Sequence, residues 1–162
     1  MAKDISIIIN ARVQSTRVPK KMIRPFAGTT LIDIALEKLQ NLDVPFKKYL
    51  GAADTEIIDI YKKYKNIELL DRTQESVEKG LNSQNVSFAH YAKIPTEYIM
   101  WINPCLPFTT NKTYKKALEH FISNNYRTMT SVKKRSNIFF YENMQAINVN
   151  KDFVSTQKQN TI

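Results

Sequence analysis

The sequence has few of the residues that mark several large classes of protein. Its single cysteine, Cys105, excludes an internal disulfide, and no apolar run approaches the roughly 18 residues of a membrane-spanning helix. The apolar stretch near the N-terminus is too short for a secretory signal and lacks a small-residue cleavage pattern. With only three glycines, the chain also lacks the glycine-rich phosphate loops GxGxxG and GxxxxGK[ST]. We therefore expect a cytoplasmic protein without a membrane partner.

The composition that is present indicates one α/β domain. At 162 residues and 43% hydrophobic composition, the chain is long enough to bury a sizeable core. Its net charge of +9 is compatible with a nucleic-acid partner. However, the lysines are spread over element ends and predicted solvent faces, and RNP aromatics or a helix-turn-helix pattern are missing. We therefore expect a solvated basic surface and no nucleic-acid partner, with a basic nucleic-acid-binding module as the alternative.

The apolar period changes repeatedly between strand-like and helix-like segments. Consecutive isoleucines at positions 7 to 9 indicate a first strand that is covered on both faces. Alternating strands and helices predict a mostly parallel sheet flanked by helices, with right-handed crossovers and a ligand site beyond the carboxyl ends of the strands. The predicted strands are 5–10, 46–52, 67–70, 97–102 and 127–132, and the predicted helices are 31–42, 54–65, 86–94 and 110–124.

The last part of the chain has a different pattern. Segments 138–141 and 145–149 flank a turn at Glu142 and Asn143, which predicts a C-terminal β-hairpin. After Lys151 the sequence is polar. We accordingly expect an α/β domain over residues 1–150 and a polar tail over residues 151–162.

The loop between the first strand and the first helix carries the clearest functional signal. The loop contains no acidic residue, and the hydroxyl of Ser15 is expected near the carboxyl edge of the sheet. Lysine supplies a mobile point charge and arginine a planar fork, so together they can hold a triphosphate and stabilise a leaving pyrophosphate. We predict that the loop cations converge on phosphates, whereas the alternative is a merely solvated loop. These cations are Arg12, Arg17, Lys20, Lys21 and Arg24.

The same loop resembles a known family. The stretch ARVQSTRVPKKMIRPFAGTTLID, residues 11–33, resembles the A-R-x-x-S-K-x-x-P-x-K-N signature of cytidylyltransferases that activate acidic sugars. These are the acylneuraminate cytidylyltransferases, or CMP-sialic acid synthetases, and their relatives. The S-T-R-L-P-x-K variant of the spore-coat polysaccharide members fits residues 15–21 more closely. Further matching segments follow in order at 51–58, 70–72, 102–108, 139–148 and 156–157.

The resemblance implies a Rossmann-like GT-A fold, that of the nucleotide-diphospho-sugar transferases. It implies that the anomeric hydroxyl of a nonulosonic or sialic-type sugar attacks the α-phosphate of CTP and releases pyrophosphate with Mg²⁺ assistance. Matched by position, Arg12 and Lys21 would be catalytic and Asn103 would bind the sugar, whereas no metal ligand can be assigned. The implied nucleotide-binding residues are Ala11, Arg12, Ser15, Arg17, Lys21, Arg72 and Ser83.

The sequence also departs from the family pattern. Thr16 replaces a lysine, for which Arg17 can compensate, and Met22 replaces an asparagine whose hydrogen bond it cannot donate. Asn103 stands for a glutamine, and Cys105 begins the pair that replaces Thr-Ser. The family places its metal-binding carboxylates, the rest of the sugar pocket and much of its homodimer contact beyond the last residue of this chain. The resemblance therefore implies either a truncated form of a longer enzyme or a short, non-catalytic homologue that binds a nucleotide or sugar nucleotide.

Several candidate residues have simpler structural interpretations. Asp54 is expected to be a helix N-cap rather than a metal ligand. Arg72 follows a strand and could pair with Asp71 at the surface, which contributes little stability. His90 has no partner at metal-ligand spacing and is expected to pack or to face solvent, and Trp101 is expected in the core. Asn103 precedes a proline and could be an ordinary turn residue.

Overall fold

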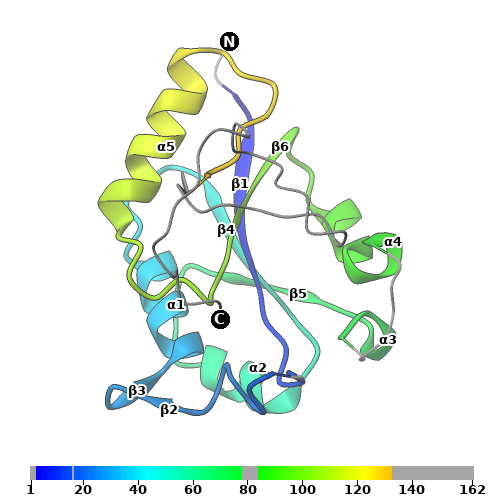
Figure 1. Ribbon diagram of the computed structural model, residues 1–162. Helices are drawn as coiled ribbons and strands as arrows, with labels where there is room; N and C mark the ends of the chain where they lie inside the picture. Colours follow the sequence, from blue (N-terminus) through cyan, green and yellow to red (C-terminus); the bar gives the residue numbers. More distant parts are fainter. Residues whose placement is uncertain (1–2, 16, 78–83, 133–162) are drawn as a thin grey trace, which may run out of the picture. The chain divides into compact units, whose positions relative to one another are not determined.

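Figure 1 shows the computed structural model of the chain, which describes residues 3–15, 17–77 and 84–132. The chain divides into two compact units, Met1–Arg127 and Thr128–Ile162, and every helix and strand among the described residues belongs to the first. The predicted strand at 127–132 is wrong, because these residues are exposed and form no ladder. The predicted C-terminal hairpin, the polar tail and Ser83 lie outside the described residues. No described helix combines the length and apolar character needed to cross a membrane.

A four-stranded parallel sheet lies at the centre of the first unit, in the order β5-β4-β1-β6. β1 (Ile5–Asn10) pairs with β4 (Lys47–Ala52) on one side and with β6 (Tyr98–Ile102) on the other. β4 in turn pairs with β5 (Glu68–Asp71). The three isoleucines at 7 to 9 are fully buried, as expected for an interior strand with both faces covered.

Helices cover the two faces of this sheet unequally. Figure 1 shows α1 (Leu31–Gln40) and α5 (Asn111–Ser123) on one side, and the short helices α3 (Gln74–Val77) and α4 (Gln84–Ser87) on the other. The larger core cluster joins Ile7 and Ile9 to apolar residues of α1, α2 (Thr55–Tyr61) and α5. A smaller cluster joins Ile8 to Tyr49, Leu70 and Ile94, next to a 3₁₀ helix, η1 (Ala89–Lys93). The predicted α/β architecture is therefore confirmed.

The segment that leads into α1 is fixed by local hydrogen bonds. The Oγ1 of Thr30 accepts from the N–H of Asp33 at 3.1 Å and donates to its Oδ2 at 2.6 Å, so Thr30 caps the N-terminus of α1. Just before it, β2 (Pro25–Phe26) and β3 (Thr29–Thr30) form a small antiparallel pair. The connecting turn holds Ala27 at φ 50° and Gly28 at φ 77°, both in the left-handed region.

The predicted helix at 86–94 is not continuous. α4 ends at Ser87, and the following residues form η1 instead. The carbonyl of Ser87 accepts a hydrogen bond from the Arg72 guanidinium at 3.2 Å. This long-range bond occupies a backbone acceptor at the end of α4, a contact that helical periodicity cannot reveal.

Candidate functional site

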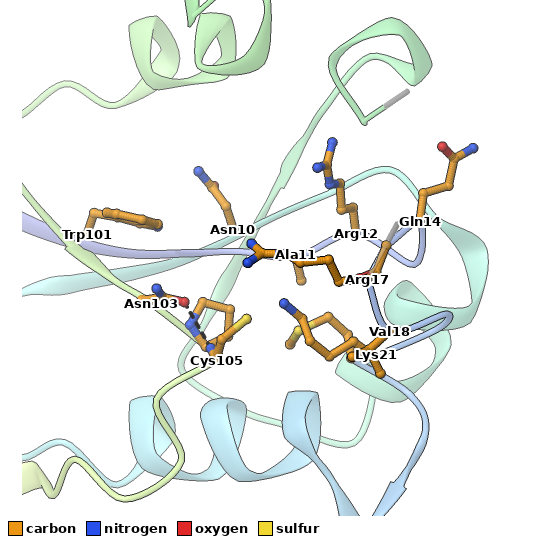
Figure 2. Close-up of a pocket in the computed structure, with 13 residues that line it drawn as sticks. Asn10, Ala11, Arg12, Gln14, Arg17, Val18, Lys21, Trp101, Asn103 and Cys105 are labelled. Carbon is orange, nitrogen blue, oxygen red and sulfur yellow. Dashed lines mark hydrogen bonds between the residues drawn. The ribbon is translucent and has the colours of Figure 1, made fainter. Parts of the chain in front are cut away.

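A cavity of about 480 Å³ opens where β1 and β6 end (Figure 2). One wall comes from the end of β1 and the loop that follows it, within residues 10–22. The other wall comes from the end of β6 and its following turn, within residues 101–105. The cavity therefore lies beyond the carboxyl ends of two neighbouring parallel strands, where the sequence predicted a ligand site.

Two of the predicted cations point into this cavity. Figure 2 shows the side chains of Arg17 and Lys21 extending across it toward Asn103 on the β6 side. Ser15 also lines the cavity. No acidic residue contributes to its described lining. The walls therefore favour an anionic ligand.

The other cations of the loop are placed differently. The Arg12 side chain lines the rim but points toward α3 (Figure 2), where its Nη1 lies 3.5 Å from the carbonyl oxygen of Val77. Lys20 and Arg24 are exposed and do not line the cavity. The structure thus brings together Arg17 and Lys21, with Arg12 beside them, and leaves the remaining two in solvent.

Arg72 lies at the end of β5 and holds the chain segment after it. Its Nη2 donates to the carbonyl oxygens of Ser76 at 2.7 Å and Ser87 at 3.2 Å, and its Nε donates to the Ser76 hydroxyl at 3.3 Å. Burial, followed by the nearby charge of Arg12, lowers the pKa of Arg72. Arg72 does not line the cavity, and its contacts are not those of a surface pair with Asp71.

Asp54 occupies the N-cap position of α2, as predicted, but its side chain does not cap that helix. Its Oδ2 instead accepts a hydrogen bond from the backbone N–H of Val13 at 3.0 Å. Asp54 thus anchors the cationic loop to the end of β4. The N-cap prediction is correct for the position of Asp54 but wrong for its side chain. The carboxylate accepts from the distant N–H of Val13 and not from an N–H of α2.

Asn10, which the sequence did not single out, is held from two sides. Its Oδ1 lies 2.8 Å from His90 Nε2, and its Nδ2 donates to the Tyr91 hydroxyl at 2.8 Å. Asn10 pairs with Gly51 across β1 and β4, and a Cβ at Gly51 would lie 2.5 Å from Asn10 Oδ1 and 2.7 Å from His90 Nε2. Glycine is therefore required there for the Asn10–His90 bond to form.

His90 is a buried packing residue, one of the two options expected for it. Only 4% of its surface is exposed, and its Nδ1 has no hydrogen-bond partner within the described part of the chain. Burial, then the charges of Arg72 and Lys93, lower the pKa of His90 to about 4. The imidazole is consequently neutral at physiological pH and donates from Nε2 to Asn10.

The β6 wall contains a correction to the sequence prediction. Asn103 forms a turn, because its Oδ1 accepts from the N–H of Cys105 at 3.0 Å, and it also lines the cavity. Trp101, expected in the core, is 53% exposed and lines the cavity as well. Its strand neighbour Ile102 is only 6% exposed. The core prediction for Trp101 is therefore wrong, because Trp101 lies on the face of β6 that the helices of the larger core cluster do not cover.

The described residues do not form a metal site. Nowhere in the segments 3–15, 17–77 and 84–132 do three His, Cys, Asp or Glu side chains come close enough together to hold a metal ion. The cavity walls themselves offer no carboxylate. Since Mg²⁺ prefers carboxylate and other hard oxygen ligands, this lining does not fit it without further ligands.

A family model described as cytidylyltransferase matches residues 6–160. The chain belongs to the cytidylyltransferase family. Two relatives of this chain are the 3-deoxy-manno-octulosonate cytidylyltransferases of Rickettsia felis and Rickettsia akari, which are 26% and 25% identical to it over 141 residues. The match covers 82% of this chain and 53% of either relative, so the chain spans about half the length of the curated relatives it matches.

Solved structures share the fold of this chain at lower identity. A CMP:2-keto-3-deoxy-manno-octonic acid synthetase complexed with CTP has a TM-score of 0.62 and 13% identity, covering 76% of this chain and 49% of that one. The 4-diphosphocytidyl-2C-methyl-D-erythritol synthase of Anaerococcus prevotii has a TM-score of 0.61 and 17% identity, covering 89% and 62%. These likenesses confirm the Rossmann-like α/β fold of the nucleotidyltransferases.

One departure from the family signature has a structural explanation in this chain. Met22 stands where the signature has asparagine, and it is 4% exposed within the larger core cluster. Its carbonyl oxygen accepts from the N–H of Ile32 at 3.0 Å, so the backbone here joins the cationic loop to α1. The Met22 side chain gives the cavity an apolar floor and no hydrogen-bond donor.

Proposed function

We propose that this chain binds CTP and takes part in activating an acidic sugar of the nonulosonic or sialic type as its CMP derivative, with release of pyrophosphate. The observation that carries the proposal is the pair Arg17 and Lys21, which point into an acid-free cavity at the end of β1 in a chain of the cytidylyltransferase family. Relatives named for 3-deoxy-manno-octulosonate, itself an acidic sugar, support the class of acceptor.

The geometry supports binding of a polyanion at the β1 side of the cavity. The mobile ammonium group of Lys21 and the planar guanidinium of Arg17 extend into the same space, and the Ser15 hydroxyl lies on the same wall. In the proposed reaction a sugar hydroxyl oxygen forms a bond to the α-phosphorus of CTP, and the bond from that phosphorus to the bridging oxygen breaks. The departing pyrophosphate gains negative charge, which fixed cations stabilise most effectively in a partly enclosed site.

Mg²⁺ is part of this proposal as the ion that accompanies CTP. When bound, it would reduce the repulsion between the triphosphate and the attacking oxygen. The described lining lacks the carboxylates to hold it, and the roles assigned to Arg17 and Lys21 rest on their own charges and position.

The first test is a calorimetric titration with CTP of the wild-type chain and of two matched variants, Lys21→Gln and Lys20→Gln. The two lysines are adjacent, but only Lys21 lines the cavity. We expect Lys21→Gln to weaken CTP binding by about tenfold or more, and Lys20→Gln to change it by less than about threefold. Absence of CTP binding at millimolar concentration, or equal losses in the two variants, would overturn the proposal.

The second test separates catalysis from binding alone. The alternative function is that of a non-catalytic homologue that binds a nucleotide or sugar nucleotide. Pyrophosphate release is measured from CTP with Mg²⁺ and either 3-deoxy-manno-octulosonate or N-acetylneuraminate. Release above the rate without sugar supports catalysis by this chain, whereas CTP binding without release supports the non-catalytic candidate.

A further inference from the structure

Trp101 is the only tryptophan of the chain, and its position on β6 is unusual for so large an apolar side chain. Its register partner on β1, Ile8, is fully buried, whereas Trp101 itself is 53% exposed. The cover on this face comes from the residues around η1, which pack against Ile8 and Ile99. Trp101 therefore presents aromatic surface to the cavity rather than to the core.

The neighbours of Trp101 around the cavity are hydrogen-bond donors. Figure 2 shows Arg17 and Lys21 reaching toward the β6 wall, where Asn103 lies beside Trp101. The Oδ1 of Asn103 accepts from the N–H of Cys105, and its Nδ2 is a further donor on a residue that lines the cavity. An aromatic ring next to several cationic and amide donors suits a ligand that combines a ring with an anionic group.

The donors of the lining favour a sugar over a nucleobase. The amide oxygens of Asn10 and Asn103 each already accept one hydrogen bond, from His90 and from Cys105. The amino group of cytosine needs an acceptor with a free lone pair, whereas the carboxylate and hydroxyl oxygens of an acidic sugar can all accept from the cationic and amide donors present. A carboxylate attached directly to a sugar ring also fits a cavity in which the cations reach toward the aromatic wall.

We propose that Trp101 is a specificity-determining residue that binds the apolar face of the acidic sugar ring, while Arg17 and Lys21 bind its carboxylate or the phosphates beside it. This inference rests on the proposed function, because it assumes that the cavity accepts both substrates. The closest ligand atoms would be ring C–H groups, which pack favourably on the face of an indole.

Because Trp101 is the single tryptophan, the tryptophan fluorescence of the wild-type protein reports ligand binding at this position. Trp101 emission is recorded during titration with 3-deoxy-manno-octulosonate and N-acetylneuraminate at saturating CTP, and during titration with CTP alone. We expect a saturable change with at least one acidic sugar and a much smaller change with CTP alone. Strong quenching by CTP alone would indicate a stacked base and would overturn the assignment to the sugar.

Calorimetry on Trp101→Ala and Trp101→Phe, with Phe108→Ala as control, completes the test. Phe108 is also aromatic and is 87% exposed, but it does not line this cavity. We expect Trp101→Ala to raise the sugar Kd by about tenfold, Trp101→Phe to raise it less, and Phe108→Ala to leave it unchanged. CTP affinity should stay within about threefold in all three variants.

The outcomes distinguish the two proposals. If the wild type binds CTP but Trp101→Ala binds the sugar as well as the wild type, the role of Trp101 is wrong and CTP binding stands. If the wild type binds CTP but neither sugar, the role of Trp101 is again wrong. If the wild type binds no CTP, the proposed function fails and the inference built on it fails with it.

Discussion

The carboxylate of Asp54 accepts a hydrogen bond from the backbone N–H of Val13, with an Oδ2–N distance of 3.0 Å. Asp54 follows β4 and Val13 follows β1, so this one contact fixes the start of the cationic loop against the neighbouring strand. The loop contributes Arg17 and Lys21 to the cavity, and its placement therefore depends on a residue that does not line the cavity itself.

Removing this carboxylate is expected to destabilise the protein and to weaken CTP binding. Asp54→Ala should lower the free energy of unfolding by about 1–2 kcal/mol, because the Val13 N–H loses its acceptor. Asp54→Asn should lose less, since an amide oxygen can still accept the bond. Urea unfolding measures the effect. Asp59→Ala, which removes an exposed carboxylate of α2 paired only with Lys62, is the control and should change stability by less than about 0.5 kcal/mol.

His90 predicts a specific pH dependence of stability. Its pKa is about 4 in the folded chain, below the ordinary value of 6.5. Between these values the unfolded chain binds a proton that the folded chain does not, so the free energy of unfolding falls as the pH drops from 6.5 toward 4. The loss should reach about 3 kcal/mol over the whole window.

Two variants isolate this contribution. His90→Gln replaces the titrating ring with a neutral amide. The free energy of unfolding of this variant should change little between pH 5 and 6.5, a range in which carboxylates contribute little. Urea unfolding at intervals of about half a pH unit measures the profile. His120→Gln removes the exposed histidine and should keep the wild-type slope. Equal slopes in the wild type and in His90→Gln would contradict the assignment.

Gly51→Ala tests the space between the backbone of Gly51 and the side chains of Asn10 and His90. The added Cβ would approach Asn10 Oδ1 at 2.5 Å and His90 Nε2 at 2.7 Å, and we expect a loss of about 1–3 kcal/mol from overpacking. In a His90→Ala background the same change should cost less, because part of the clash is removed. A double-mutant cycle by urea unfolding measures this coupling, and additive losses would show that Gly51 acts independently of His90.

The turn between β2 and β3 offers a stabilising change. Ala27 has φ 50°, a conformation that glycine and asparagine adopt at lower cost than alanine. Ala27→Gly and Ala27→Asn should each raise the free energy of unfolding by about 0.5–1 kcal/mol in thermal or urea unfolding. Gly28→Ala, at φ 77° with open space around it, should lower it through backbone strain alone. A destabilising effect of both Ala27 variants would contradict this account.

Sequence reasoning was most successful where local pattern and burial agree. The isoleucines of β1 predicted an interior parallel strand, and the helical period from residue 31 predicted α1. The cavity also lies where strand order and loop charge placed it. In these places a short stretch of sequence is sufficient, because its residue types show which faces of a strand are buried or where a helix begins.

The failures have a common physical origin in long-range contacts. Asn10 and His90 are 80 positions apart, and their hydrogen bond depends on strand register and on the placement of η1. The exposure of Trp101 depends on which face of β6 the helices cover, and alternation alone cannot decide that. The segment 127–132 has a strand-like pattern but no surface to pack on in the described structure, and β-propensity has little effect without one.

The pairing of β1 with β6 has a kinetic consequence. This register joins Ile5 to Tyr98, so the two walls of the cavity come from regions that are distant along the chain. Closing so long a loop is entropically costly and slow, which means that the cavity cannot exist in an early, locally structured folding intermediate. A bound ligand would therefore slow the separation of these two strands, and amide hydrogen exchange along β1 is where that protection should be greatest.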